Sequence, residues 1–208
     1  MNHDTDSDRA LLVIDVQESF RRRPNWRAVS APDIDARAAR LAGAARAAGD
    51  LVVWVLHAEP GTGGVFDPEI GHVRLMDGLA PAAGEPVLTK TSRNAFTTTA
   101  LQQMLTERGI RELVVCGIQT EQCCETTARL AADLGYRVTF VTDATATFPI
   151  PHRDAPPGRS LADVLADPAT LLPDQIIART EYALAGRFAD IAALDDLAPV
   201  PGPAGAVN

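Results

Sequence analysis

One short stretch restricts the fold of this chain more than any other: an apolar, β-rich run that passes directly into a segment of helical spacing. The run Glu112-Leu-Val-Val-Cys116 shows no alternation, which is typical of a strand buried on both faces of a parallel sheet. From Thr126 onward, residues recur at helical spacing until Gly135, which supplies a helix stop. The sequence therefore predicts a strand–turn–helix unit over 112–134.

Similar patterns alternate along the rest of the chain. Strands are expected near 10–15, 51–57, 86–90, 112–117, 137–142 and 188–193, and helices near 32–48, 97–108, 123–134 and 174–185. This alternation predicts an α/β fold with three layers, α-β-α, around a mostly parallel six-stranded sheet. Because no repeat or linker divides it, 1–208 is predicted to be a single domain with flexible tails at 1–8 and 199–208.

The predicted turn after the strand contains two adjacent cysteines, Cys123 and Cys124. A thiol near a helix N-terminus experiences the positive end of the helix dipole and unpaired N–H groups, which are expected to lower its pKa. The same N–H groups can bind an oxyanion. The alternative is that Cys123 is a small buried hydrophobe. We expect core packing for Cys124, an inert Cys116 inside the strand, and no disulfide framework.

Two more polar residues stand at the ends of predicted strands. Asp15 follows the apolar run at 10–14, where partial burial would raise its pKa and make it a candidate proton acceptor. Lys90 ends the strand expected at 86–90. Since the carboxyl ends of parallel strands share one edge of a sheet, Asp15, Lys90 and Cys123 are expected to meet in one cleft. Taken singly, each charge has an alternative reading as a solvated loop residue or a structural ion pair.

The motifs around these residues resemble those of the isochorismatase-like cysteine hydrolases, which include nicotinamidases, N-carbamoylsarcosine amidases, ureido- and biuret-type amidohydrolases and isochorismatase. They are Asp15-Val-Gln-x-x-Phe20, Lys90 followed by Asn94-Ala-Phe96, and Gly117-x-x-Thr-x-x-Cys123. The resemblance extends from about Ala10 to Phe148, and more weakly to about Leu197. It implies a catalytic triad of Cys123, Asp15 and Lys90. It further implies a cis peptide at Ile118–Gln119 and an oxyanion hole formed by the backbone N–H groups of Gln119 and Cys123.

The same resemblance implies a cysteine-dependent hydrolase that cleaves an amide or ureido C–N bond of a small non-peptide substrate through a thioester. Two alternatives stay open: hydrolysis of another bond, such as a vinyl ether or an ester, and a noncatalytic α/β binding protein. Family members that cleave a vinyl ether lack the nucleophilic cysteine. Cys123 is present here, so amide-type hydrolysis is favoured.

Substrate choice would depend on the residues that line the pocket. The candidates are Gln17, Phe20, His57, Phe96 and Gln119, with Trp26 and Phe66 as further aromatic possibilities. No cofactor is expected. No metal is expected either, because His57 has no second histidine at short spacing and His72 is too far along the chain.

Two loops have predicted roles of their own. The glycine-rich segment 61–64 is expected to be a flexible loop over the cleft, without the strand-to-helix context of a phosphate-binding loop. The proline-rich segment 148–158 is an ordinary surface loop, a lid or a subunit contact.

Charge and hydropathy restrict the partners. The formal net charge of −8 argues against nucleic acid, although Lys90 or Arg93 could bind a small anion locally. No apolar run approaches membrane-spanning length, and the polar N-terminal residues lack the apolar core of a signal peptide, so a cytoplasmic protein with no membrane partner is expected. The family resemblance implies a homodimer or homotetramer.

Overall fold

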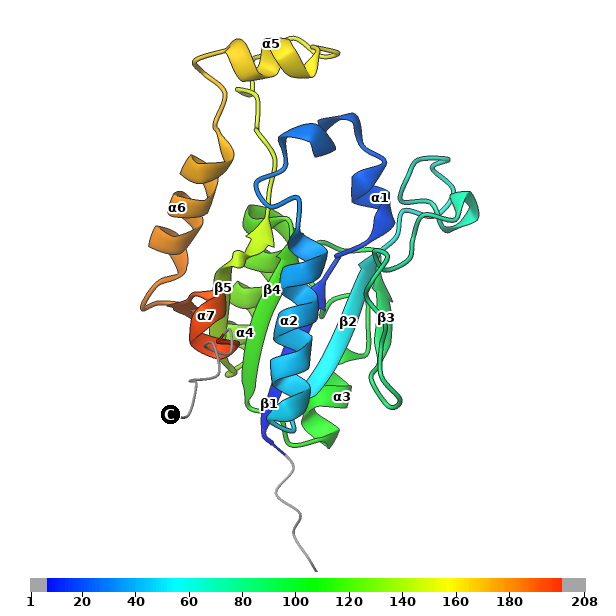
Figure 1. Cartoon of the computed structure of the whole chain (residues 1–208), viewed down its shortest axis with the longest axis vertical. Helices are drawn as coiled ribbons and strands as arrows, with labels where there is room; N and C mark the ends of the chain where they lie inside the picture. The colour runs from blue at the N-terminus through cyan, green and yellow to red at the C-terminus, as the bar shows by residue number, and fades with distance from the viewer. Residues whose placement is uncertain (1–6, 200–208) are drawn as a thin grey trace, which may run out of the picture.

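The computed structural model describes residues 7–199, which form one parallel sheet covered by helices on both faces (Figure 1). The strands are β1 (Arg9–Ile14), β2 (Leu51–His57), β3 (Val87–Lys90), β4 (Glu112–Ile118), β5 (Arg137–Ala146) and β6 (Asp190–Ala192). All six are parallel, in the order β3-β2-β1-β4-β5-β6. The predicted three-layer α/β fold is confirmed. The sixth strand is shorter than expected, and the fifth is longer.

Seven helices accompany the sheet within the described residues. They are α1 (Glu18–Arg21), α2 (Ile34–Ala47), α3 (Leu101–Glu107), α4 (Glu125–Asp133), α5 (Leu161–Ala166), α6 (Pro173–Leu184) and α7 (Leu194–Leu197). The four predicted helices correspond to α2, α3, α4 and α6. Helix α3 begins four residues later than predicted, because the Asn94 side chain accepts hydrogen bonds from the N–H groups of Phe96 and Thr97 and holds a turn there. The short helices α1, α5 and α7 are not predicted, since four to six residues are too few to show a helical period.

The core consists of two layers, one on each face of the sheet. Helices α2 and α7 pack on the face to which β1 contributes Leu11 and Val13. Helices α3, α4 and α6 pack on the opposite face, to which β1 contributes Leu12 and Ile14. Because both faces of β1 and β4 are covered, nearly every residue of these strands is buried, which explains why their sequences do not alternate.

The carboxyl edge of the sheet brings the ends of four strands together. In register, Ile14 of β1 pairs with Gly117 of β4, and His57 of β2 pairs with Lys90 of β3. From β1, the strand order runs toward β2 and β3 on one side and toward β4, β5 and β6 on the other side. In open α/β sheets, ligands bind at the carboxyl edge where the strand order reverses in this way.

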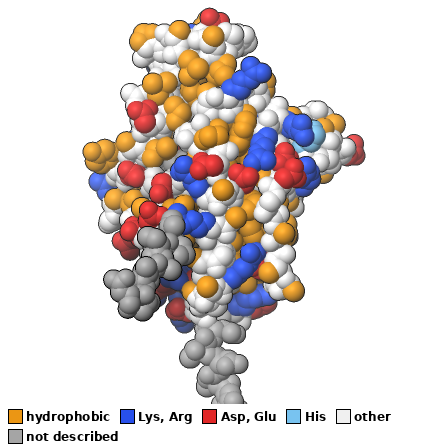
Figure 2. Space-filling view, in the orientation of Figure 1, with side chains coloured by type: hydrophobic (Ala, Val, Ile, Leu, Met, Phe, Trp, Pro, Cys, Tyr) orange, Lys and Arg blue, Asp and Glu red, His pale blue; other side chains and the backbone are white. Residues whose placement is uncertain are grey.

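An arm formed by residues 149–172 extends away from the sheet and carries α5 at its tip (Figure 1). Reciprocal backbone hydrogen bonds of 2.9 Å between Ile150 and Leu171 close its base. Figure 2 shows apolar side chains on this arm, whereas charges of both signs are scattered over the body. Its exposed apolar residues are Ile150, Leu165, Leu171 and Leu172. The roles considered for 148–158, a lid or a subunit contact, stay predictions.

Part of the predicted tails contacts the body of the protein. Ser7 donates a 2.6 Å hydrogen bond to Asp50, and the carbonyl of Asp8 accepts from two backbone N–H groups. The flexibility expected for 1–8 and 199–208 stays a prediction, and residues 1–6 and 200–208 lie outside the described residues. Across 7–199, no helix combines the length and the apolar character needed to cross a bilayer.

Candidate active site

The backbone turns sharply where β1 ends and presents Asp15 to the carboxyl edge. Asp15 has a left-handed φ of +54°, a conformation that aspartate tolerates better than most residues, and its N–H donates to the carbonyl of Val55 at 2.8 Å. Its carboxylate is fully buried. One carboxylate oxygen, Oδ1, has no hydrogen-bond partner among residues 7–199. This acceptor is therefore available to a proton donor inside the site.

The end of β4 approaches β1 so closely that only glycine fits there. Gly117 has φ +130°, and a Cβ atom at this position would lie 1.9 Å from the carbonyl oxygen of Ile14. The following peptide bond, Ile118–Gln119, is cis. A single π-helical turn (Thr120–Cys124) then leads into α4 and contains the backbone N–H of Cys123. Both backbone groups expected to form an oxyanion hole therefore lie in or next to this turn.

Lys90 joins the predicted triad. Its fully buried ammonium nitrogen, Nζ, lies 2.8 Å from Asp15 Oδ2 and 3.4 Å from the sulfur of Cys123. A third contact, at 3.3 Å, reaches Nδ1 of His57. An ammonium group has three donors and no acceptor, so each contact can use one N–H. The structure thus brings Asp15, Lys90 and Cys123 together and adds His57 to them.

The contact with Lys90 also fixes the proton on His57. Because Lys90 can only donate, Nδ1 of His57 must accept, and the ring proton lies on Nε2. From there it can be donated to Glu59 Oε1 at 3.2 Å. Burial and the nearby Lys90 lower the pKa of His57, which agrees with a neutral ring. The side chain of Arg93 lies 3.1 Å from Nε2 of His57. Because that nitrogen carries the proton, it offers no lone pair to Arg93, which pairs with Glu59 at 3.7 Å.

Burial decides the protonation states of the triad. It raises the pKa of Asp15 above the usual 3.8, against the opposing effect of Lys90. Burial, together with the charge of Asp15, raises the pKa of Cys123 to about 12, although Lys90 acts in the other direction. The expected lowering of the pKa of Cys123 is therefore wrong in direction, because removal of the sulfur from water and the charge of Asp15 both disfavour the thiolate. The resting thiol is protonated.

A cleft of about 450 Å³ opens above the triad, a size suited to a small molecule. Its lining residues are Asp15, Phe20, Arg23, His57, Glu59, Gly64, Val65, Phe66, Arg93, Gln119, Gln122 and Cys123. The predicted pocket residues Phe20, His57, Phe66 and Gln119 are among them. The glycine-rich loop contributes Gly64 and thus borders the cleft, as expected.

Three predicted pocket residues lie elsewhere. Gln17 is buried below the cleft, where its amide accepts from the N–H of His57 at 2.7 Å and donates to the His57 carbonyl at 3.0 Å. Phe96 stacks on Tyr136 in the core, with ring centroids 6.1 Å apart. Trp26 packs against Phe148 and borders a different cavity. Gln17 and Phe96 therefore stabilise the walls and do not face the cleft.

Sequence reasoning missed several lining residues, of which Arg23, Glu59 and Gln122 are polar. Gln122 directly precedes Cys123, and Glu59 follows the second strand by two residues, so adjacency to strand ends could have identified both. Arg23 carries no such signal, because it lies in a run of three arginines at 21–23 and does not adjoin a strand end.

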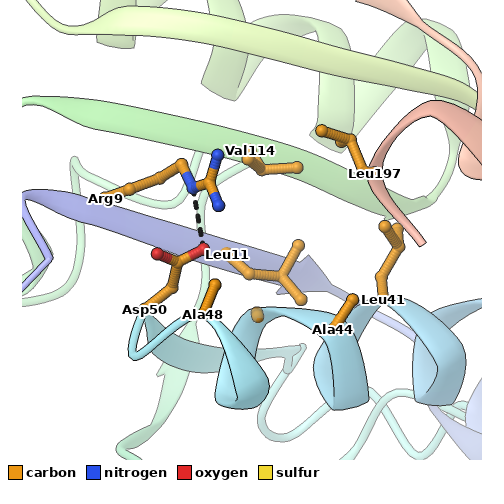
Figure 3. Close-up of a pocket in the computed structure, with 9 residues that line it drawn as sticks. Arg9, Leu11, Leu41, Ala44, Ala48, Asp50, Val114 and Leu197 are labelled. Carbon is orange, nitrogen blue, oxygen red and sulfur yellow. Dashed lines mark hydrogen bonds and ion pairs between the residues drawn. The ribbon is translucent and has the colours of Figure 1, made fainter.

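A second cavity lies away from this edge, between β1 and α2 (Figure 3). Leu11, Leu41, Val114 and other aliphatic side chains line it, and the only charged residues there, Arg9 and Asp50, pair with each other at 2.7 Å. The described residues that line it include neither a nucleophile nor an unpaired charge. Within residues 7–199, no three His, Cys, Asp or Glu side chains are grouped to hold a metal ion.

Known proteins share both the sequence and the fold. A streptothricin hydrolase from Streptomyces noursei is 42% identical over 154 residues, which cover 73% of this chain and 58% of that protein. A ureidoacrylate amidohydrolase from Methylorubrum extorquens is 31% identical, with 71% of each chain covered. An isochorismatase structure from Pseudomonas putida has a TM-score of 0.77 at 33% identity and covers 91% of this chain and 90% of its own.

The extent of these matches differs between the chains compared. The matched region spans 58% and 51% of two streptothricin hydrolases, so this chain covers little more than half of those relatives. The isochorismatase domain model matches residues 9–160. This region contains strands β1 to β5, the first half of the arm and all three triad residues. On the shared motifs, fold and domain match, the chain belongs to the isochorismatase family.

Proposed function

We propose that this protein is a cysteine-dependent hydrolase that cleaves an amide or ureido C–N bond of a small non-peptide substrate through a thioester. The observation that carries this proposal is the position of Lys90, whose ammonium contacts both Asp15 at 2.8 Å and the Cys123 sulfur at 3.4 Å under the cleft. Further support comes from two similar proteins: one is a streptothricin hydrolase, and the other is a ureidoacrylate amidohydrolase.

Asp15 is the proposed base. The thiol of Cys123 is protonated at rest, so it must lose its proton as it attacks the substrate carbonyl. The unpartnered Oδ1 of Asp15 can accept that proton, while Oδ2 keeps its hydrogen bond to Lys90. The raised pKa of Asp15 makes the carboxylate a stronger base than one in water. The Lys90 ammonium, 3.4 Å from the sulfur, stabilises the forming thiolate.

The remaining steps use the same groups. The sulfur forms a bond to the carbonyl carbon, and the carbonyl oxygen becomes an oxyanion bound by the N–H groups of Gln119 and Cys123. When the C–N bond breaks, Asp15 returns its proton to the leaving nitrogen and a thioester is left on Cys123. Asp15 then takes a proton from water, whose oxygen attacks the thioester and releases the acid. Asp15 finally returns this proton to the sulfur, so the free thiol is regenerated.

The experiment that tests this function is ammonia release from a panel of small carboxamides, ureido acids and biuret. Cys123→Ala is compared with Cys124→Ala, because the neighbouring Cys124 is fully buried, does not line the cleft and is a matched control. Release by wild type and Cys124→Ala, but not by Cys123→Ala, is expected. Activity that survives Cys123→Ala would exclude the proposed nucleophile. Esters and vinyl ethers release no ammonia, so the alternative bond types are tested separately by chromatography of their acid, alcohol or carbonyl products. A homodimer or homotetramer stays a proposal that depends on the family, and a cytoplasmic location stays a proposal that depends on the hydropathy of the sequence.

A further inference from the structure

The charges that line the cleft cancel, except for one. Asp15 and Lys90 form a buried pair at 2.8 Å, and Glu59 pairs with Arg93 at 3.7 Å. His57 is neutral and Cys123 is a thiol, for the reasons given above. Arg23 is the remaining charged residue among those that line the cleft. The cleft therefore has one uncompensated positive charge in a chain whose formal net charge is −8.

Arg23 is held at the cleft wall by aromatic rings. Its guanidinium carbon lies 5.4 Å from the centroid of Phe148 and 5.9 Å from that of Phe20, which itself lines the cleft. The guanidinium forms no ion pair and donates no side-chain hydrogen bond within residues 7–199, whereas most other arginines of this region have a carboxylate partner. Contact with rings orients a guanidinium but leaves the donors at its edge free.

With no carboxylate paired to it among the described residues, the guanidinium of Arg23 can bind an anionic ligand in the cleft that it shares with Cys123. Burial and the charge of Arg93 lower the pKa of Arg23, and the charge of Glu59 raises it, but Arg23 forms no ion pair with Glu59 among residues 7–199. A carboxylate suits the planar donor edge best, because two parallel N–H···O bonds can form at once. The net negative charge of the chain repels anions in general. A positive residue inside the cleft therefore favours the binding of anionic substrates at that position.

We infer that Arg23 is a specificity-determining residue that binds a carboxylate on the substrate, so that the substrates are amide or ureido acids and not neutral amides. This inference rests on the proposed function and narrows its substrate class. The inference assigns anion binding to Arg23 and not to Lys90 or Arg93, the two cations that the sequence suggested. Lys90 is occupied by Asp15, and Arg93 is occupied by Glu59.

A pair of probes isolates the carboxylate. Succinamate and succinamide both carry a primary carboxamide, but succinamide has a second carboxamide in place of the carboxylate. Binding of each is measured by isothermal titration calorimetry to full-length Cys123→Ala protein, in which turnover does not interfere. The comparison adds Arg23→Met, which removes the charge and keeps much of the side-chain length, and Arg22→Met, the matched control on the exposed neighbour.

We expect Cys123→Ala to bind succinamate more tightly than succinamide. Arg23→Met should weaken succinamate binding by about tenfold or more and remove the preference between the two probes, as expected for loss of a charge-assisted bidentate pair. Arg22→Met should preserve both affinities. An Arg23→Lys variant, which keeps the charge without the planar fork, should recover only part of the preference.

Three results would overturn the inference: no saturable binding of succinamate, equal affinity for both probes, or an equal loss in the Arg22 and Arg23 variants. A melting curve for each variant shows whether a loss of binding reflects unfolding. The proposed function fails by a different readout, the survival of ammonia release in Cys123→Ala, so the two failures are distinguishable.

Discussion

His57 and Lys90 are register partners on the neighbouring parallel strands β2 and β3, and Nδ1 of the imidazole lies 3.3 Å from the ammonium nitrogen. The pairing puts both side chains on the same face of the sheet, directly under the cleft. His57 therefore supplies the third acceptor of a lysine that has no access to water. It also connects the buried triad to Glu59 at the cleft rim.

If His57 holds Lys90 in place, removal of its acceptor should weaken catalysis. His57→Phe leaves one Lys90 donor unsatisfied, at a cost of about 1–3 kcal/mol, so kcat/KM should fall about 10- to 100-fold. His57→Asn keeps a short side chain with an acceptor near Nδ1 and should retain more activity. The measurement is kcat/KM for a substrate found in the panel, with melting curves as a control for folding. Equal losses in the two variants would remove the acceptor role.

The pH dependence of catalysis should reveal the state of Asp15. The base must be ionised, and its pKa is raised by burial, so kcat/KM should decline on acidification at a higher pH than the usual 3.8. Lys90 lowers the pKa of Asp15, so Lys90→Met should shift the acid limb of the residual activity to still higher pH. Protonation of His57 should affect kcat/KM only below pH 6.5, because the pKa of His57 is lowered from that usual value. An acid limb that does not move in Lys90→Met would contradict this coupling.

Asp15 should suppress the thiolate of the resting protein. Burial and the charge of Asp15 raise the pKa of Cys123 to about 12, so little of the thiol is ionised at pH 8. Asp15→Asn removes the negative charge that raises this pKa and leaves Lys90 in place, so iodoacetamide should label Cys123 faster at pH 8 although turnover is lost. Peptide mass mapping should find the label at Cys123, because Cys116 and Cys124 are fully buried. Slower labelling of Asp15→Asn would show that the carboxylate promotes the thiolate instead.

Gly117 should tolerate no side chain. Gly117→Ala would place a Cβ atom 1.9 Å from the Ile14 carbonyl oxygen, so β1 and β4 would have to separate, at a cost of about 4 kcal/mol or more. Gly43→Ala is the matched control, because Gly43 lies inside α2 with nothing within 4 Å of the new Cβ. This control should gain about 0.5–1 kcal/mol from higher helix propensity. Urea unfolding of both variants gives the comparison, and similar stabilities would contradict the close approach.

Much of the fold could be predicted because its signals are local. Each strand of the sheet centre appears as a short apolar run without alternation, and α2, α4 and α6 show helical spacing over several turns. The ends of strands then identified Asp15, Lys90 and the turn that contains Cys123. Helix α3 was misjudged at its start, where the Asn94 side chain competes with helical backbone bonds.

The pocket was harder to predict, because a residue near the site can face either way. Gln17 and Phe20 occur in the same motif, yet Gln17 turns down to bind the His57 backbone, whereas Phe20 turns toward the cleft. Their directions follow from α1, a single turn with no readable period. The pKa of Cys123 could not be predicted for a similar reason. The sequence indicates a helix N-terminus near the thiol, but it does not indicate how deeply the sulfur is buried.

By itself, the sequence determined the parallel α/β fold and the strand ends that carry Asp15, Lys90 and Cys123, since hydrophobic periodicity and strand direction are properties of short segments. Only the tertiary structure decided which charges cancel. Arg93 forms an ion pair with Glu59, and Lys90 contacts Asp15 and His57. Arg23 contacts two aromatic rings and forms no ion pair with a carboxylate among the described residues. Such pairings join residues tens of positions apart, and they depend on how loops pack above the sheet and not on any local pattern.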